Sequence, residues 1–366
     1  MELRYPLKRR KSKTVKIGDV IIGGGFPIAI QSMTTADTRD ADSTIAQINQ
    51  LFDAGCEIVR ISVLNHEAAE NLEKIRDNVK QPIVADIHFQ YKLALKAIEA
   101  GFDKIRINPG NIGAEWKVRE VTKAAKDAEV PIRIGVNSGS LPEDVLKQYG
   151  HDDPRAFVEA AIREIQVLED MNFNDIIISV KSSSTKTTFW AYHMLAEKCD
   201  YSLHIGITES GTLDTGTVKS SVGIGAMLMT GIGDTLRVSL SADPIHEVKV
   251  AKQILKSCEL MQEGVEVIAC PTCGRCQIDM ISLAESIEAK TRHIKTPLKV
   301  AVMGCAVNGP GEAKAADVGI AGGDGQGMLI KKGEIVARFK EEELEEKLLS
   351  EIELMTGEKI EQAKPD

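Results

Sequence analysis

The sequence predicts an α/β protein in which a (β/α)8 TIM barrel, residues 1–258, precedes a smaller α/β domain, residues 259–366. Three observations support this fold class. Eight short runs rich in β-branched residues recur along the first part of the chain, helix-compatible segments separate them, and the alternation stops after residue 258. A parallel barrel needs a crossover helix after each strand and usually takes about 250 residues. A doubly wound open sheet is the alternative.

The eight expected strands start at residues 28, 57, 82, 104, 131, 175, 203 and 235, with the runs IAIQSM, EIVRISV, PIVADIHF, KIRINPGN, PIRIGVNSG, DIIISVKSS, LHIGITESG and TLRVSLS. Between them lie helix-compatible segments such as STIAQINQLFDAG, KLALKAIEAG, AFVEAAIREIQVLEDMN and PIHEVKVAKQILKSC. Several of these open with Ser, Thr or Asp and close at Gly, as helices do. Strand and helix therefore alternate throughout the first domain.

The second domain has a different pattern. LKVAVMGCAVNGPGE predicts a strand followed by a glycine-rich loop, and GMLIKKGEIVARF predicts a hairpin. The segment EEELEEKLLSEIELMTG has apolar residues at helical spacing and predicts a helix near the end of the chain.

The composition excludes some classes of partner. With 45 basic and 54 acidic residues, the surface is mildly acidic, which argues against a nucleic-acid binder. No run approaches the roughly 18 apolar residues of a membrane helix, so no membrane partner is expected. The basic first sixteen residues lack a following apolar run, which argues against a secretory signal and favours a solvated arm. We expect a cytoplasmic protein.

Polar residues late in the expected strands mark a candidate site. Alternate side chains of a barrel strand point inward, and the carboxyl ends of the strands form the catalytic face. One charged residue there is usually a solvated or ion-paired rim group. Five strands that each contribute Arg or Lys favour a small substrate with several negative charges, such as a phosphate or diphosphate ester. The candidate residues are Arg60, Asp86, His88, Arg106, Asn108, Arg133, Asn137, Lys181, Thr208, Glu209, Arg237 and Ser239.

Two of these candidates have several possible roles. His88 is an acid, a ligand or a satisfied core residue. Glu209 is the carboxylate best placed for proton transfer, because neighbouring cations would set its pKa. The turns NPGNIG and GVNSGSLPED could bring backbone amides close to an anion, although neither is a P-loop because no GK[ST] follows.

The seven cysteines are expected to be reduced, since disulfides are rare in the cytoplasm. Cys56, Cys199 and Cys258 are expected to be small buried apolar residues. The remaining four lie in two loops that contain glycine and proline.

The loop ACPTCGRC suggests a metal centre. Cys270 and Cys273 have the C-x2-C spacing of a zinc half-site, but only Cys305 and His293 follow, so zinc is poorly supported. An iron–sulfur cluster fits better, because this spacing plus a remote cysteine can hold three corners of a cube. On spacing alone, either Cys276 or Glu312 could complete the site.

The segments ACPTCGR and GCAVNGPGEA resemble the 4-hydroxy-3-methylbut-2-enyl diphosphate synthase family, bacterial flavodoxin- or ferredoxin-dependent enzymes of the non-mevalonate isoprenoid pathway. GGGFPIAIQSMTTADTRD, VRIS, ADIHF, KIRINPGNIG, RIGVNSGSL and SVKSS extend the resemblance over nearly the whole chain. It implies a [4Fe–4S] cluster held by Cys270, Cys273, Cys305 and Glu312, with Cys276 nearby as a non-ligand. A displaceable carboxylate on one iron would leave room for substrate oxygen.

The resemblance also implies the reaction. The substrate would be 2-C-methyl-D-erythritol 2,4-cyclodiphosphate, reduced with two electrons and two protons to (E)-4-hydroxy-3-methylbut-2-enyl diphosphate and water. Reduced flavodoxin or ferredoxin would supply the electrons, and the barrel and cluster domain would come from different subunits of a homodimer. Two alternatives remain open: a transferase similar to dihydropteroate synthase with a structural metal, and an iron–sulfur sensor or electron carrier.

Overall fold

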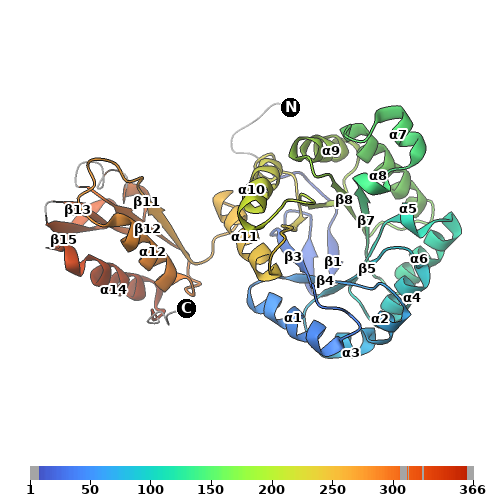
Figure 1. Ribbon diagram of the computed structural model, residues 1–366, viewed down its shortest axis with the longest axis horizontal. Helices are drawn as coiled ribbons and strands as arrows, with labels where there is room; N and C mark the ends of the chain where they lie inside the picture. Colours follow the sequence, from blue (N-terminus) through green and yellow to red (C-terminus); the bar gives the residue numbers. More distant parts are fainter. Residues whose placement is uncertain (1–7, 306–310, 312, 324, 361–366) are drawn as a thin grey trace. The chain divides into compact units, whose positions relative to one another are not determined.

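The computed structural model describes residues 8–305, 311, 313–323 and 325–360. The chain divides into two compact units, Met1–Met261 and Gln262–Asp366 (Figure 1). Each unit is described by itself below.

Within residues 8–305, the first unit forms a closed parallel barrel with the strand order β10-β3-β4-β5-β6-β7-β8-β9. Seven of these strands lie within runs expected from the sequence and β9 starts one residue before its run, so the predicted fold class is confirmed. The strands are β3 (Ala29–Met33), β4 (Ile58–Ser62), β5 (Ile83–Ile87), β6 (Lys104–Ile107), β7 (Ile132–Asn137), β8 (Ile176–Lys181), β9 (Ser202–Ile205) and β10 (Thr235–Leu236).

Helices surround this barrel (Figure 1). Several of them begin at Asp or Ser residues whose side chains cap the helix. Asp40 accepts a hydrogen bond from the Ser43 amide at the start of α1, and Ser184 accepts one from the Thr187 amide at the start of α9. The helices of this unit are α1 (Ala41–Asp53), α2 (His66–Glu70), α3 (Leu72–Asp77), α4 (Tyr91–Glu99), α5 (Pro109–Ile112), α6 (Glu115–Asp127), α7 (Glu143–Tyr149), α8 (Pro154–Glu169), α9 (Thr185–Lys198), α10 (Leu213–Met229) and α11 (Pro244–Ser257).

The strands are apolar on the side that faces the helices and largely polar on the side that faces the barrel axis. Outward residues such as Ile61, Ile105 and Ile134 belong to the main hydrophobic core. The residues between them include Arg60, Arg106 and other buried cations. Most barrels of this type fill the interior with bulky aliphatic side chains. In this barrel the apolar packing therefore lies mainly between the strands and the surrounding helices. The interior contains polar side chains that can bind a polar ligand.

A hairpin that the sequence did not predict closes one end of the barrel. Its strands, β1 (Val15–Ile17) and β2 (Val20–Ile22), pair antiparallel. The hairpin side chains pack against apolar residues at or near the starts of β3, β4, β5 and β8, namely Ala29, Ile58, Val84 and Ile177. A ligand must therefore enter from the opposite end, where the strands end.

Arg9 and Arg10, before this hairpin, do not belong to the solvated arm expected from the sequence, and residues 1–7 of that expected arm lie outside the described residues. Arg10 Nη2 donates to the carbonyl oxygens of Cys199 and Tyr201 at 2.6 and 2.9 Å. Arg9 Nη2 donates to the Gly233 carbonyl at 3.1 Å. These arginines satisfy backbone carbonyls near β9 and β10, a contact that charge patterning alone does not reveal.

The second unit contains, in its described part, a mixed sheet with the order β11-β12-β13-β14-β15. The first three strands are parallel and the last two pairings are antiparallel. Helices α12 and α14 contribute Ile287, Leu348 and Ile352 to a core with Val300 and Ile320. The elements are β11 (Val265–Ala269), α12 (Met280–Thr291), β12 (Leu298–Met303), β13 (Val318–Gly323), β14 (Gln326–Lys331), β15 (Glu334–Lys340) and α14 (Leu344–Thr356).

The predicted strand, hairpin and final helix of this unit correspond to β12, β14 with β15, and α14. Strands β11 and β13 were not predicted. None of the helices in the described residues is both long enough and apolar enough to cross a membrane.

Glu164 on α8 provides a test of the barrel's pH dependence. Burial raises the pKa of this carboxyl from 4.5 to about 7. The folded state therefore binds more protons than the unfolded state between these values, and stability falls as pH rises through this window. We expect Glu164→Gln to raise the free energy of unfolding by about 1–3 kcal/mol near pH 8 and to change it little near pH 4. Urea unfolding followed by tryptophan fluorescence measures this, because Trp116 and Trp190 both lie in the barrel unit.

The control is Glu120→Gln, which removes an exposed carboxylate from α6. It should leave the free energy of unfolding unchanged at both pH values. An equal effect of Glu164→Gln at both values would contradict the assignment of the raised pKa to Glu164.

Candidate active site

A cavity of about 310 Å³ lies at the end of the barrel opposite the hairpin. It is lined by residues that follow strands β5 to β9, which come from distant parts of the sequence. Six of the residues singled out in the sequence line it: His88, Arg106, Asn108, Asn137, Thr208 and Glu209. The turn Ser138–Ser140 and Asn111, from the two glycine-containing loops noted in the sequence, complete much of the wall.

Asp86 organises the cations beside this cavity. Its carboxylate accepts a 2.9 Å hydrogen bond from Arg106 Nη1, and Arg60 Nε and His88 Nε2 each lie 3.6 Å away. Burial would raise the pKa of Asp86, but the Arg60 and Arg106 guanidinium groups together hold it well below its usual range. Asp86 is therefore ionised and fixes both arginines. This geometry gives it a positioning role beside a ligand.

In the described part of the chain, Arg133 and Lys181 have no such carboxylate partner. Arg133 is 2% exposed, and its Nε and Nη1 atoms have no hydrogen-bond partner within the described residues. The Nε atom of Arg106 also has no hydrogen-bond partner among these residues. Burial, reinforced by neighbouring cations, lowers the pKa of both Arg133 and Lys181 well below the usual values. Unsatisfied buried donors are costly, and an anion with several oxygens would satisfy them.

Two glycines make room for these cations. A Cβ at Gly135 would lie 2.7 Å from Arg106 Nε, and one at Gly206 would lie 2.8 Å from Lys181 Nζ and 2.4 Å from the Arg237 carbonyl oxygen. Any larger residue would displace the long side chains from the barrel axis. The sequence analysis missed both, although each glycine stands two residues from a polar strand residue, where an inward-facing position is expected.

Arg237 is held by Glu247 of α11, a residue that the sequence analysis also missed. Arg237 Nε and Nη2 each lie 3.2 Å from a Glu247 oxygen. The same carboxylate accepts hydrogen bonds from Ser32 Oγ at 2.8 Å and from the Leu240 amide at 3.0 Å. Glu247 is 3% exposed, so it is a fixed interior anion. Ser239, two residues after Arg237, is half-buried.

The cysteines of the second unit follow two neighbouring strands. Cys270 comes directly after β11 and Cys305 comes shortly after β12, and Ala269 pairs with Val302 in these parallel strands. Cys273 is exposed, and hydrogen bonds from the backbone and then the side chain of Arg275 lower the pKa of its thiol. The Gly304 amide donates to Cys270 Sγ at 3.3 Å. Backbone donors of this kind tune sulfur ligands of metal clusters.

Cys276 is engaged differently. Its thiol donates to the Ile278 carbonyl at 3.3 Å and packs at the edge of the hydrophobic core of the second unit. A Cβ at Gly304 would lie 2.5 Å from Cys276 Sγ, so the two loops touch here. The thiol fills space between them.

Glu312, the expected fourth ligand, lies outside the described residues. Among the described residues, no three His, Cys, Asp or Glu side chains converge closely enough to hold a metal ion. The donor chemistry of Cys270, Cys273 and Cys305 nevertheless fits an iron–sulfur cluster, because three free thiols follow adjacent strands, one has a lowered pKa and another accepts a backbone amide.

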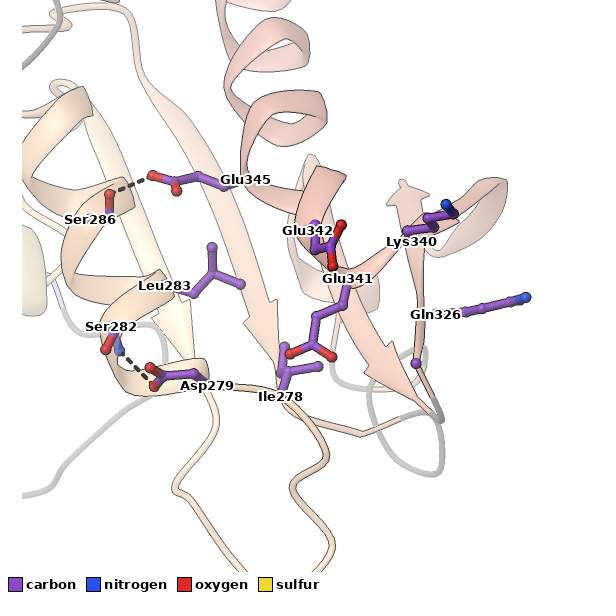
Figure 2. Close-up of a pocket in the computed structure, with 11 residues that line it drawn as sticks. Ile278, Asp279, Ser282, Leu283, Ser286, Gln326, Lys340, Glu341, Glu342 and Glu345 are labelled. Atoms are coloured by element: carbon purple, nitrogen blue, oxygen red, sulfur yellow. Dashed lines mark hydrogen bonds between the residues drawn. The ribbon is translucent and has the colours of Figure 1, made fainter.

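A larger, open groove of about 1000 Å³ lies elsewhere on the second unit (Figure 2). Among the described residues, its lining includes Asp279, Glu341, Glu342 and Glu345 and a single cation, Lys340. Figure 2 shows that Asp279 caps the amide of Ser282 and that Glu345 accepts a hydrogen bond from Ser286. Four carboxylates make this groove unsuitable for a diphosphate, so the barrel cavity is the better anion site despite its smaller size.

Comparison with protein families identifies the chain. Residues 12–252 match the GcpE TIM-barrel domain, and residues 266–354 match the GcpE protein C-terminal domain. The chain belongs to the GcpE family. A relative in Caldanaerobacter subterraneus is 55% identical over 96% of this chain and 99% of its own length, and one in Bacillus subtilis is 53% identical over 98% and 95%. Both are named 4-hydroxy-3-methylbut-2-en-1-yl diphosphate synthase (flavodoxin).

These matches confirm the resemblance seen in the sequence motifs. As a member of the GcpE family, the chain is an oxidoreductase of isoprenoid biosynthesis. Among solved structures, dihydropteroate synthase from Stenotrophomonas maltophilia covers 68% of this chain and 97% of its own, with a TM-score of 0.50 and 16% identity. That likeness shows the barrel fold alone and gives no support to the transferase alternative.

Proposed function

We propose that this GcpE-family enzyme reduces 2-C-methyl-D-erythritol 2,4-cyclodiphosphate to (E)-4-hydroxy-3-methylbut-2-enyl diphosphate. The observation that carries the proposal is a set of buried barrel arginines with side-chain nitrogens, Arg106 Nε and Arg133 Nε and Nη1, that have no hydrogen-bond partner among the described residues. Two electrons and two protons open the ring and release one water, so the reaction balances only with an external reductant. The flavodoxin in the names of the relatives supports reduced flavodoxin, or a ferredoxin, as that donor.

In this proposal the barrel binds and orients the diphosphate. Arg106, Arg133 and Lys181 would offer charge-assisted hydrogen bonds to phosphate oxygens. Asn108, Asn137 and Thr208, at the same mouth, would fix the rest of the substrate. Arg60 and Arg237 add positive charge, although Asp86 and Glu247 already hold their side chains. His88 and Ser239 stay candidate contacts at the rim.

The second domain would hold a [4Fe–4S] cluster through Cys270, Cys273, Cys305 and Glu312. Such a cluster transfers one electron at a time and can bind a substrate oxygen where its ligand is a carboxylate rather than a thiolate. The polypeptide contributes thiolate stabilisation through Arg275 and a backbone hydrogen bond from Gly304 to Cys270.

Glu209 is the proposed proton donor. Glu209 is one of the residues that line the cavity, and its backbone has a φ of 51°, an unusual conformation for a residue other than glycine. Strained positions of this kind concentrate at functional sites. We expect Glu209→Gln to lower kcat by about 10²- to 10⁴-fold, the usual contribution of general acid catalysis, without changing the iron content.

Steady-state kinetics with quantified iron checks this prediction. The control is Asp214→Asn, which removes an acidic group from the first turn of the nearby helix α10 and should keep full activity. Full activity of Glu209→Gln would assign the proton transfer to another group.

We also propose a homodimer in which the barrel of one subunit meets the cluster domain of the other. Helix α10 supports self-association because it is apolar on two faces. Ile224 and Met227 are buried against the barrel, while Val218, Val222 and Met229 are 66, 61 and 59% exposed. Helices that are hydrophobic all round are normally covered.

Introducing charge on this exposed stripe tests the dimer. We expect the double substitution Val218→Glu and Val222→Glu to shift the protein to a monomer in sedimentation experiments. The control substitutions Lys117→Glu and Lys123→Glu on α6 should not. An unchanged sedimentation coefficient of the α10 variant would place the interface elsewhere or exclude it.

Anaerobic turnover tests the proposed function directly. Purified protein with quantified iron is mixed with a reduced low-potential donor and the cyclodiphosphate, and the product is identified by phosphorus NMR. The linear diphosphate should form only when the reductant is present. If iron-replete protein leaves the substrate unchanged, the substrate assignment is wrong.

A further inference from the structure

A second layer of polar side chains lies inside the barrel, beneath the arginines. Its members stand on β3, β6, β9 and β10, and each is at most 1% exposed: Gln31, Lys104, His204 and Thr235. On β6, β9 and β10 they precede Arg106, Gly206 and Arg237 by two residues, so they face the same interior one level nearer the hairpin. Lys104 Nζ donates to Gln31 Oε1 at 2.9 Å across non-adjacent strands, which places both in the interior.

Lys104 is an unusual member of this layer because none of its carboxylate neighbours among the described residues forms an ion pair with it. Its hydrogen-bond acceptor, Gln31, is uncharged. Arg60 on β4 and Arg133 on β7 are the charged groups that act on it most, and both are cations. On the neighbouring strand β5, Lys104 pairs with Val84, and the next inward residue, Asp86, is already held by Arg60 and Arg106. Burial, followed by Arg133 and Arg60, therefore lowers the pKa of Lys104 well below its usual value.

His204, on β9, lies in a similar environment. Neither ring nitrogen has a hydrogen-bond partner in the described part of the chain. Burial, followed by Lys181, Arg133, Lys104 and Arg60, lowers the pKa of this imidazole well below its usual value. Burial beneath a cluster of cations therefore favours the uncharged form of both bases of the layer. A lysine amine is a stronger base than an imidazole by several pKa units. Of the two, Lys104 is therefore the first to accept a proton when the repulsion from the neighbouring cations is reduced.

We propose that Lys104 takes up a proton from solvent when a diphosphate binds to the arginines above it, so that substrate binding is coupled to proton uptake. The inference rests on the proposed anion site. The negative charges of the ligand offset the repulsion that Arg60 and Arg133 exert on a protonated Lys104. By thermodynamic reciprocity, the proton on Lys104 then tightens the binding of the anion. Lys104 does not contact the ligand. It is a positioning residue whose positive charge attracts the anion through long-range electrostatics.

Isothermal titration calorimetry of the full chain measures this coupling. Inorganic diphosphate and the cyclodiphosphate are each titrated in two buffers with different ionisation enthalpies, and the difference in heat gives the number of protons exchanged. Titrating each ligand without protein gives the heat of dilution, and protons exchanged by the ligand itself or by Lys181 are common to the wild type and the variant. We expect Lys104→Met to take up about one proton fewer per bound ligand than the wild-type protein while still binding. Lys16→Met, at an exposed position of β1, should match the wild type.

A second measurement needs no substitution, in case Lys104→Met does not fold. In the pH range between the two pKa values of Lys104, free and bound, the Kd of the wild-type protein should rise about tenfold per pH unit. Equal proton uptake by wild type and Lys104→Met, or heats independent of the buffer, would overturn the inference. Absence of any diphosphate binding would overturn the anion site itself. Turnover without proton uptake would leave the proposed function standing and remove only the role of Lys104.

Discussion

Replacing Cys273 with alanine is expected to abolish both the bound iron and the turnover of the cyclodiphosphate. Cys273 is exposed, so its loss removes no packing and the chain should fold as before. Its thiol has a lowered pKa because Arg275 donates to it from backbone and side chain, which favours the thiolate that a cluster requires. Two cysteines cannot hold three corners of a cluster, so iron per chain and visible absorbance should both fall to background in anaerobically purified protein.

Cys276→Ala is the matched control in the same loop. The Cys276 thiol donates to the Ile278 carbonyl and packs against Gly304, so its loss should cost about 1 kcal/mol of stability and leave the iron content intact. If the two variants lost iron equally, Cys276 would be a ligand and the site would be the all-cysteine electron-transfer centre. If Cys273→Ala kept its iron and activity, the proposed cluster site would be wrong.

Replacing Arg133 with methionine is expected to lower kcat/KM while raising the stability of the ligand-free protein. The guanidinium is 2% exposed, and two of its nitrogens have no partner in the described residues. Removing a buried, poorly paired charge in favour of an apolar chain of similar length is often stabilising, by about 1–4 kcal/mol. Losing a charged hydrogen bond to the substrate costs about 3 kcal/mol, which corresponds to a factor of about 100 in kcat/KM.

A fall in kcat/KM together with a rise in the stability of the ligand-free protein would distinguish a binding role of Arg133 from a structural one. Kinetics under anaerobic conditions gives the first value, and urea unfolding of the ligand-free protein gives the second. Arg119→Met, which removes an exposed cation from α6, should change neither by a measurable amount. A loss of stability in Arg133→Met would show that the guanidinium holds the barrel together, and unchanged kinetics would exclude it from substrate binding.

The sequence predicted the barrel because its strands carry a local signal. Runs such as PIVADIHF are bounded by turn residues and separated by helices with clear caps, so each strand can be recognised without its neighbours. The inward positions were also readable: Arg60, Arg106 and Arg133 stand at alternate positions among isoleucines and valines, where period-two alternation points them away from the helices. Their gathering around one mouth follows from the fold class itself.

The strands and site residues that the sequence analysis missed also have a physical explanation. Strands β1, β2, β11 and β13 are short or have mixed patterns, and their pairing depends on partners distant in the chain. Glu247 was missed because it lies on a helix with an ordinary sequence pattern, and Gly206 was missed because it has no side chain to mark it. Their importance comes entirely from what lies opposite them in space.

The sequence by itself thus determined the fold class and the family, because periodic patterns and short motifs are local properties of the chain. Only the tertiary structure decided how the charges are divided. It pairs Arg60 and Arg106 with Asp86 and Arg237 with Glu247, and among the described residues it gives Arg133, Lys181 and Lys104 no carboxylate partner. The physical reason is that burial and the distance between charges set each side chain's electrostatic state, and both quantities exist only after distant strands have come together.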